Sequence, residues 1–314
     1  MLTQQPLFAV APISSKVALL ENLRSVNGKS KYKRYIGTPI RYAGGKSLAV
    51  GHIIERLPDG ITRLVSPFLG GGSFEVACAR ELGIEVTAYD IFDILVNFWQ
   101  ELLSDAHGLY EKLKQLSPTK ETYAQVKERL KAHWDGEIHL PPLELATLYY
   151  FNHNLSYGPG FLGWMSKIYE NSGRYESMLR RLRDFSAPSL QAHCLSFEES
   201  IPLHNGEFLY CDPPYYLGGD SLMFRGIYPQ RNFPIHHKGF DHELLRDLLR
   251  EHCGGFILSY NDCPTIREWY ADFKIVDVSW QYTMGQGETR IGLNRIADNR
   301  GHVKKSHEIL IASI

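Results

Sequence analysis

Residues 61–103 alternate strand and helix patterns around a glycine loop. An apolar strand, ITRLVSPF, leads into LGGG, which is followed by a helical stretch, SFEVACAREL, and a second strand, IEVTAYD. A strand–helix–strand unit of this kind predicts a parallel pair of strands in an α/β fold. The alternation leaves few other fold classes open.

The strand–helix alternation is interrupted and then resumes. Five further strand patterns follow the interruption: LQAHCL, EFLYCD, GFILSYND, FKIVDVSW and EILIAS. The interrupting residues, 98–190, are helical and charged at first and then rich in aromatic residues and glycine. We therefore predict a sheet domain made of residues 36–97 and 191–314, an inserted domain at 98–190, and a basic N-terminal arm at 1–35 that shows no clear periodicity.

The overall composition is that of an ordinary globular protein. Hydrophobic residues make up 44% of the chain and charged residues 22%. No apolar run approaches the roughly 18 residues that a membrane span needs. The first residues lack the basic start and the long apolar centre of a secretory signal. We therefore expect a cytoplasmic protein that does not enter a membrane.

Cysteine and histidine are scattered along the chain. The five cysteines include no C-x-x-C pair, and the 13 histidines do not join them at the spacing of zinc ligands. We therefore predict reduced thiols and no metal site.

Positive charge is clustered, although the net charge is only −1. Residues 22–54 contain seven Lys or Arg and no acidic residue, and residues 286–306 contain five against two acids. Clusters of this kind can neutralise phosphates on a nucleic acid. The alternative is that these charges are ordinary solvent-exposed side chains that bind nothing.

The glycine loop is followed by spaced acidic residues. Glycine between a strand and a helix lets a ligand lie against bare backbone. The dinucleotide fingerprint needs a third glycine three positions after Gly72, where this chain has Glu75. Asp90 ends the next strand, where a carboxylate can accept hydrogen bonds from ribose hydroxyls. A nucleoside with a cationic group, such as S-adenosylmethionine, suits this pattern; a purely structural turn is the alternative.

The segment RYAGGKS ends like a phosphate-binding loop. The Walker pattern requires a glycine five positions before Gly45, and Ile40 stands there. We therefore exclude nucleoside triphosphate hydrolysis. Lys46 remains as a charge that the glycine turn can bring into a site.

The stretch EFLYCDPPYY ends a strand with one acid, two prolines and two aromatics. Prolines cannot donate to a β-ladder, so Asp212 and Tyr215 are placed at a strand end, where open α/β sheets bind ligands. The Asp212 carboxylate and the Pro213 carbonyl can accept both hydrogens of an exocyclic base amine, and Tyr215 can stack on the base. Pro214 stiffens the turn. A simple strand-ending turn is the alternative.

Six segments in order, RYAGGKS, PFLGGG, AYD, CDPPYY, FDHELL and FILSYND, resemble the Dam-like DNA adenine N6-methyltransferases, the D12 class, alpha group. The resemblance extends over residues 38–314. It implies a Rossmann-like, seven-stranded class I methyltransferase sheet, parallel except for one strand near the C-terminus. It also implies S-adenosylmethionine as cofactor, S-adenosylhomocysteine as product, and a mostly helical target-recognition domain at 98–190 that binds double-stranded DNA.

The resemblance also assigns site residues. The catalytic strand end would be Asp212, Pro213, Pro214 and Tyr215. Cofactor-binding residues would be Tyr42, Ala43, Gly44, Lys46, Phe68, Gly70, Gly72, Asp90, Phe197 and Asp212. Many relatives carry an acid just before the aromatic at 197, whereas this chain has Ser196.

Candidate DNA contacts lie in and after the insertion. By the resemblance, the insertion's side chains of types that read base edges or bind phosphates are Asn152, Asn154, Tyr157, Lys167, Arg174, Arg180, Arg181 and Arg183, with Tyr260 near the base pocket. We expect the insertion's three aromatics, Tyr157, Phe161 and Trp164, to form a small core around the glycines rather than to wedge into the duplex.

Other functions remain as alternatives to adenine methylation of duplex DNA. A catalytically degenerate DNA-binding protein is opposed by the complete DPPY and Asp90. The fold alone does not exclude an enzyme that acts on RNA, but the large basic insertion favours a duplex. Cytosine N4-methyltransferases usually carry serine or asparagine in place of Asp212, and Glu75 opposes an NAD dehydrogenase. A cognate restriction endonuclease is a candidate partner, while the target sequence and the oligomeric state stay open.

Overall fold

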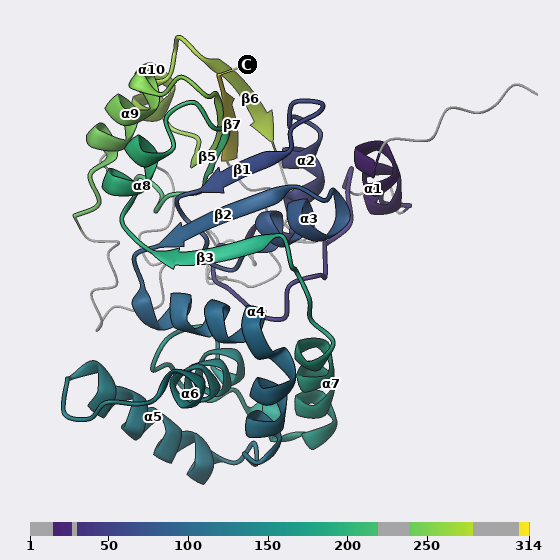
Figure 1. Cartoon of the computed structure of the whole chain (residues 1–314), viewed down its shortest axis with the longest axis vertical. Coiled ribbons are helices and arrows are strands. Elements are labelled where there is room, and N and C mark those ends of the chain that lie inside the picture. The colour runs from purple at the N-terminus through teal and green to yellow at the C-terminus, as the bar shows by residue number, and fades with distance from the viewer. Residues whose placement is uncertain (1–14, 27–29, 219–238, 279–307, 314) are drawn as a thin grey trace, which may run out of the picture.

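The computed structural model describes residues 15–26, 30–218, 239–278 and 308–313. Figure 1 shows one twisted sheet with helices on both of its faces and a helical lobe formed by α5, α6 and α7 beside it. This arrangement confirms the predicted α/β class. The basic stretch at 286–306 lies outside the described residues.

Seven strands form a single sheet in the order β3-β2-β1-β4-β5-β7-β6. Every neighbouring pair is parallel except those that involve β7, which runs antiparallel to both β5 and β6. The strands are β1 Arg63–Ser66, β2 Glu85–Asp90, β3 Leu190–Cys194, β4 Leu209–Cys211, β5 Phe256–Asn261, β6 Lys274–Val278 and β7 Glu308–Ala312. The predicted sheet, with one antiparallel strand near the C-terminus, is confirmed.

The helices cover both faces of the sheet and form the lobe beside it (Figure 1). They are α1 Ser15–Leu23, α2 Val50–Ile54, α3 Ser73–Glu81, α4 Asp93–Lys114, α5 Lys120–Trp134, α6 Pro142–Leu155, α7 Ser172–Arg183, α8 Phe197–Leu203, α9 His242–Glu251 and α10 Pro264–Trp269. Side chains of α2, α3 and α4 share one core with the helical lobe, and those of α8, α9 and α10 form a second core on the opposite face.

Central strands are apolar along their whole length because both faces are covered. All six residues of β5 are buried. Its alternate side chains enter opposite cores, with Ile257 in the first and Leu258 in the second. This explains why FILSYND reads as a continuous apolar run rather than as an alternating one.

The insertion is not separated from the sheet at residue 98, because that position falls inside α4. The first part of α4 is anchored to the sheet, where Gln100 Nε2 donates to the carbonyl of Ala192 at 2.9 Å. The helix breaks at Asp105, which has φ −149° and ψ 72° and accepts from the amide of Gly108 at 2.8 Å. The second part packs against α7. Residue 98, the predicted start of the insertion, therefore lies inside a helix that is kinked at Asp105, and the domain bounds stay a prediction.

The N-terminal arm is partly structured, contrary to the aperiodic arm predicted for 1–35. Helix α1 buries Leu19 and Leu23 and packs against α2 and α3. Lys16 Nζ pairs with Asp59 at 2.7 Å and fixes its start. The helix escaped prediction because most apolar residues of SKVALLENL are consecutive rather than spaced along one helix face, so a segment this short shows no clear periodicity.

The predicted aromatic core of the insertion is only partly correct. Phe161 is buried against Phe92 and Trp134, at ring-centroid distances of 5.4 and 5.5 Å. Tyr157 and Trp164 are instead 78% and 81% exposed. A backbone hydrogen bond of 2.6 Å from the Tyr157 amide to the Trp164 carbonyl closes the loop between them, which turns both rings away from the core.

The described residues contain neither a candidate membrane span nor a candidate metal cluster. None of the helices is both long and apolar enough to pass through a bilayer. No three His, Cys, Asp or Glu side chains in this part of the chain lie together as a possible metal site. All five cysteines are free thiols.

Candidate active site

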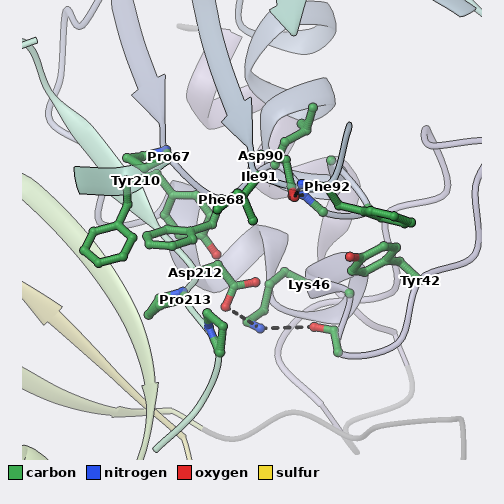
Figure 2. A pocket seen from close by; sticks show the side chains of 18 of the residues that line it. Tyr42, Lys46, Pro67, Phe68, Asp90, Ile91, Phe92, Tyr210, Asp212 and Pro213 are labelled. Carbon is green, nitrogen blue, oxygen red and sulfur yellow. Dashed lines mark hydrogen bonds and ion pairs between the residues drawn. The ribbon is translucent and has the colours of Figure 1, made fainter. Parts of the chain in front are cut away.

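A cavity of about 280 Å³ lies at the carboxyl ends of β1, β2 and β4. The strand order reverses at β1 and β4, which is where open α/β sheets leave a ligand crevice. Figure 2 shows Phe68, Asp90 and Asp212 around this cavity, with Tyr42 and Lys46 reaching it from the segment before α2. Every residue predicted to bind cofactor or to catalyse lines this one cavity.

The glycine loop presents bare backbone to the cavity. Gly70 and Gly72 have φ of +46° and +61°, a left-handed conformation that favours glycine. A Cβ on Gly70 would lie 3.1 Å from the Tyr42 ring, and one on Gly72 would lie 2.7 Å from the Trp99 ring. Trp99 Nε1 also donates to the Gly70 carbonyl at 3.0 Å. The loop is therefore held between two aromatic rings that leave no room for side chains.

The Gly72→Ala variant is expected to lose more stability than Gly83→Ala, its control. Both glycines have similar φ, +61° and +68°, but an added Cβ at Gly83 meets nothing within 4 Å. The left-handed backbone should cost about 1–2 kcal/mol in each variant. The contact with Trp99 should cost Gly72→Ala about 1–3 kcal/mol more. Denaturant unfolding of both variants measures the difference, and equal losses would contradict the packing of the loop.

Asp90 ties the end of β2 to the glycine loop. Its Oδ2 accepts from the Gly70 amide at 2.9 Å and its Oδ1 from the Phe92 amide at 3.0 Å. Each carboxylate oxygen can accept a second hydrogen bond. Asp90 therefore has the capacity to bind the hydroxyls of a ribose while it shapes the loop.

Three phenylalanines form one wall of the cavity. Phe68 stacks on Phe197 at a centroid distance of 5.7 Å, and Phe240 lies 4.9 Å from Phe197. Flat apolar rings of this kind suit a purine base. The sequence predicted Phe68 and Phe197 but missed Phe240, although the segment FDHELL that contains it was singled out.

Lys46 and Asp212 form an ion pair at the catalytic strand end. Lys46 Nζ lies 2.7 Å from Asp212 Oδ1, and the two side chains are 5% and 20% exposed. Lys46 Nζ also donates to the Gly44 carbonyl at 3.1 Å and lies 4.9 Å from the centre of the Tyr215 ring. Burial raises the pKa of Asp212, and the Lys46 charge opposes that rise. Apart from this ion pair, the buried Oδ1 has no hydrogen-bond partner among the described residues.

The Tyr215 ring is fixed from behind. Its hydroxyl donates to Glu308, a buried residue of β7. Its ring also stacks on that of Tyr260 at a centroid distance of 6.2 Å. The sequence did not indicate Glu308, because β7 is far from DPPY along the chain and only the antiparallel pairing brings them together.

A family model for D12 class N6 adenine-specific DNA methyltransferases matches residues 42–284. The chain belongs to this family. The match includes the glycine loop and the DPPY strand end, and it confirms the resemblance inferred from the six segments.

Two curated relatives are named as a Type II methyltransferase and a DNA adenine methylase. The chain is 24% identical over 294 residues to the Type II methyltransferase M.FokI of Planomicrobium okeanokoites, covering 74% of this chain and 42% of the relative. It is 24% identical over 199 residues to the Retron Ec67 DNA adenine methylase of Escherichia coli, covering 57% and 64%. The chain therefore spans less than two thirds of the length of these relatives.

A second buried acid, Glu75 on α3, also lines the cavity. Burial raises its pKa to about 8, opposed by a hydrogen bond that Ser66 Oγ donates at 2.7 Å. Glu75 is therefore mostly protonated at neutral pH. Asp212, not Glu75, supplies the negative charge that Lys46 pairs with.

Burial argues against three of the predicted DNA contacts, because the side chains of Asn152, Asn154 and Tyr260 are fully buried. Asn152 Oδ1 accepts from the Leu162 amide and Asn154 Oδ1 from the Arg41 amide, both at 2.8 Å. Tyr260 lies in the core, hydrogen-bonded to His242. The two asparagines hold neighbouring backbone in place, and burial of all three side chains argues against direct contact with a base edge.

The remaining predicted DNA contacts are exposed. Lys167 lies in a short 3₁₀ turn, Lys167–Glu170, and Arg174 lies in the first turn of α7. Both stay predictions as DNA-binding residues. Arg174 also lines a second cavity next to the first.

Proposed function

We propose that the chain transfers a methyl group from S-adenosylmethionine to the N6 amine of adenine in double-stranded DNA. Membership of the D12 family and the names of both relatives support DNA adenine methylation. The observation that carries the proposal is the Asp212 carboxylate, which is paired with Lys46 through Oδ1, remains 20% exposed, and lines a cavity with a bare glycine loop.

The lining of the cavity fits a nucleoside cofactor without phosphates. Phe68, Phe197 and Phe240 would pack against an adenine, Asp90 would accept from ribose hydroxyls, and the Gly70–Gly72 backbone would pass close to the rest of the molecule. When bound, S-adenosylmethionine supplies a methyl group made electrophilic by its sulfonium.

The chain's contribution to catalysis would be to orient and activate the amine. The lone pair of an exocyclic amine is delocalised into the base, which makes the amine a poor nucleophile. Asp212 and the Pro213 carbonyl would accept its two hydrogens and favour a pyramidal nitrogen. The rigid Pro213–Pro214 corner keeps these acceptors in position before substrate arrives. The Lys46 charge opposes the rise that burial causes in the pKa of Asp212, and so favours the ionised form that can accept.

A base inside a duplex cannot reach this cavity, so the adenine must leave the stack. Extruding a base costs a few kcal/mol. The Tyr215 ring, held by Glu308, would stack on the base and offset part of this cost. Preorganisation of the ring reduces the entropy lost on binding.

Methylation assays on matched substrates test the proposal. The protein is incubated with labelled S-adenosylmethionine and either duplex DNA or RNA of the same sequence, and the modified positions are located at single-base resolution. We expect label on adenine N6 within one short DNA sequence. Transfer to RNA alone would favour the RNA methyltransferase alternative, and no transfer would favour a degenerate DNA-binding protein.

A cognate restriction endonuclease is the partner that we propose. One relative is named a Type II methyltransferase, a name that links it to restriction–modification. Co-expression of a neighbouring endonuclease with the active and the inactive chain would test this proposal, because only an active methyltransferase should protect the host DNA from cleavage.

A further inference from the structure

A second cavity of about 400 Å³ lies next to the first and shares the wall Tyr42–Gly45 with it. Four arginines line the second cavity: Arg34, Arg41, Arg174 and Arg181. No described Asp or Glu lines it. In a chain whose net charge is −1, this is a local concentration of positive charge with no role in the chemistry proposed above.

Two of the arginines, Arg34 and Arg41, belong to the segment that precedes Lys46 and are held by residues outside it. Arg34 Nη1 donates to Ser47 Oγ at 3.1 Å. Arg41 Nη1 donates to the Asn154 carbonyl at 2.5 Å, and its guanidinium lies 5.2 Å from the centre of the Tyr169 ring. Burial lowers the pKa of Arg41, so a nearby anion would offset an existing cost. These side chains are positioned rather than loosely solvated.

The other two arginines project from one face of α7. Arg174 and Arg181 are seven residues apart, and Ser177 and Met178 between them also line the cavity. Positions i, i+3, i+4 and i+7 share one helix face. Neither arginine forms an ion pair with a carboxylate in the described part of the chain, whereas Arg183 on the same helix is paired with Asp184 at 2.7 Å.

We propose that this cavity binds a phosphate of the DNA backbone and thereby anchors the strand beside the catalytic cavity. Guanidinium groups match phosphate oxygens through paired N–H donors. A shared wall places the anchor directly behind the glycine turn that carries Lys46, so the duplex would be held in register with the Lys46–Asp212 pair. This inference rests on the proposed function, because it needs DNA as the substrate. Backbone contacts carry no sequence information.

Salt-dependent DNA binding by the full chain tests the inference. Affinity for an unmethylated cognate duplex and for an unrelated duplex is measured from 50 to 300 mM salt for wild type and for the double variant Arg174→Ala/Arg181→Ala. We expect the double variant to bind both duplexes about 10- to 100-fold more weakly, and the slope of log affinity against log salt to fall by about one to two. Arg180→Ala is the matched control, since Arg180 is exposed on α7 but does not line the cavity.

Each outcome separates the possibilities. An unchanged slope in the double variant, with steep dependence in wild type, would overturn the phosphate anchor and leave the proposed function intact. A loss confined to the cognate duplex would also overturn it, because it would indicate base reading. If wild type binds RNA but not duplex DNA, both proposals fail. If inorganic phosphate at millimolar concentration protects wild type against heating while the slope is unchanged, the cavity takes a free anion instead.

Discussion

The Asp212→Ala variant is expected to lose about 10³-fold in methyl-transfer rate, equivalent to about 4 kcal/mol of transition-state stabilisation. The carboxylate is the acceptor at the end of β4 that lies closest to Lys46, and alanine offers no acceptor in its place. Binding of S-adenosylmethionine should change little, because the glycine loop, Asp90 and the phenylalanine wall are untouched. Single-turnover transfer to duplex DNA and calorimetric titration of the cofactor separate the two effects.

The matched control is Asp262→Ala. Asp262 follows β5, the neighbour of β4, and pairs with Arg267 at 2.6 Å, but it does not line the cavity. The Asp262→Ala substitution removes a paired acid from the next strand end without changing the cavity, so methyl transfer should stay near the wild-type rate. A wild-type rate of methyl transfer by Asp212→Ala would contradict the catalytic role proposed for Asp212.

A stability measurement separates loss of catalysis from loss of the folded state in Asp212→Ala. Removing Asp212 leaves the Lys46 ammonium buried without its partner, which destabilises a fold independently of catalysis. The double variant Lys46→Met/Asp212→Ala removes both charges and should recover thermal stability. It should not recover methyl transfer. Recovery of activity together with stability would mean that Asp212 supports the fold rather than the reaction.

The sheet could be predicted because its strands are short apolar runs bounded by glycine, proline and acidic residues. Burial on both faces makes a segment such as FILSYN uniformly apolar, and this signal does not depend on distant parts of the chain. The strand order follows less directly. The family resemblance implied one antiparallel strand near the C-terminus, but the place of β7 between β5 and β6 was not predicted, since no local pattern specifies which strands are neighbours.

Half of the candidate site could be predicted for the same reason. Gly70, Asp90 and Asp212 act where strands end, and a strand end is visible in the sequence as a change of residue type. Phe240 and Glu308 were missed because tertiary packing, not local pattern, brings them to the cavity and to Tyr215.

The predicted DNA contacts failed where residue type was taken as a sign of exposure. Asn152 and Asn154 are polar, but they lie on a helix whose neighbouring loops need hydrogen-bond acceptors in the interior. A buried asparagine that satisfies a backbone amide looks the same in sequence as an exposed one that reads a base. For Arg174 and Arg181 of α7, residue type was consistent with exposure, but that both line one cavity is apparent only in the structure.

The Lys46→Met variant is expected to shift the acidic limb of the pH–rate profile upward by about 1 to 3 pH units. Burial raises the pKa of Asp212 and the charge of Lys46 lowers it, so removing that charge must raise the pKa further. A protonated Asp212 carries a hydroxyl hydrogen where an acceptor is required. Activity is therefore lost as pH falls through the pKa of Asp212, and in the variant this loss begins at higher pH.

The control Lys127→Met distinguishes this effect from the loss of a partly buried lysine beside an aromatic ring. Lys127 resembles Lys46, because it lies 4.8 Å from the centre of the Trp164 ring and donates to the Gly163 carbonyl at 3.3 Å. It forms no ion pair with a carboxylate in the described residues, so its replacement should leave the acidic limb in place. Single-turnover rates from pH 5 to 9 measure both profiles. If Lys46→Met lowers the rate equally at every pH, Lys46 positions the substrate or the loop and does not act by keeping Asp212 ionised.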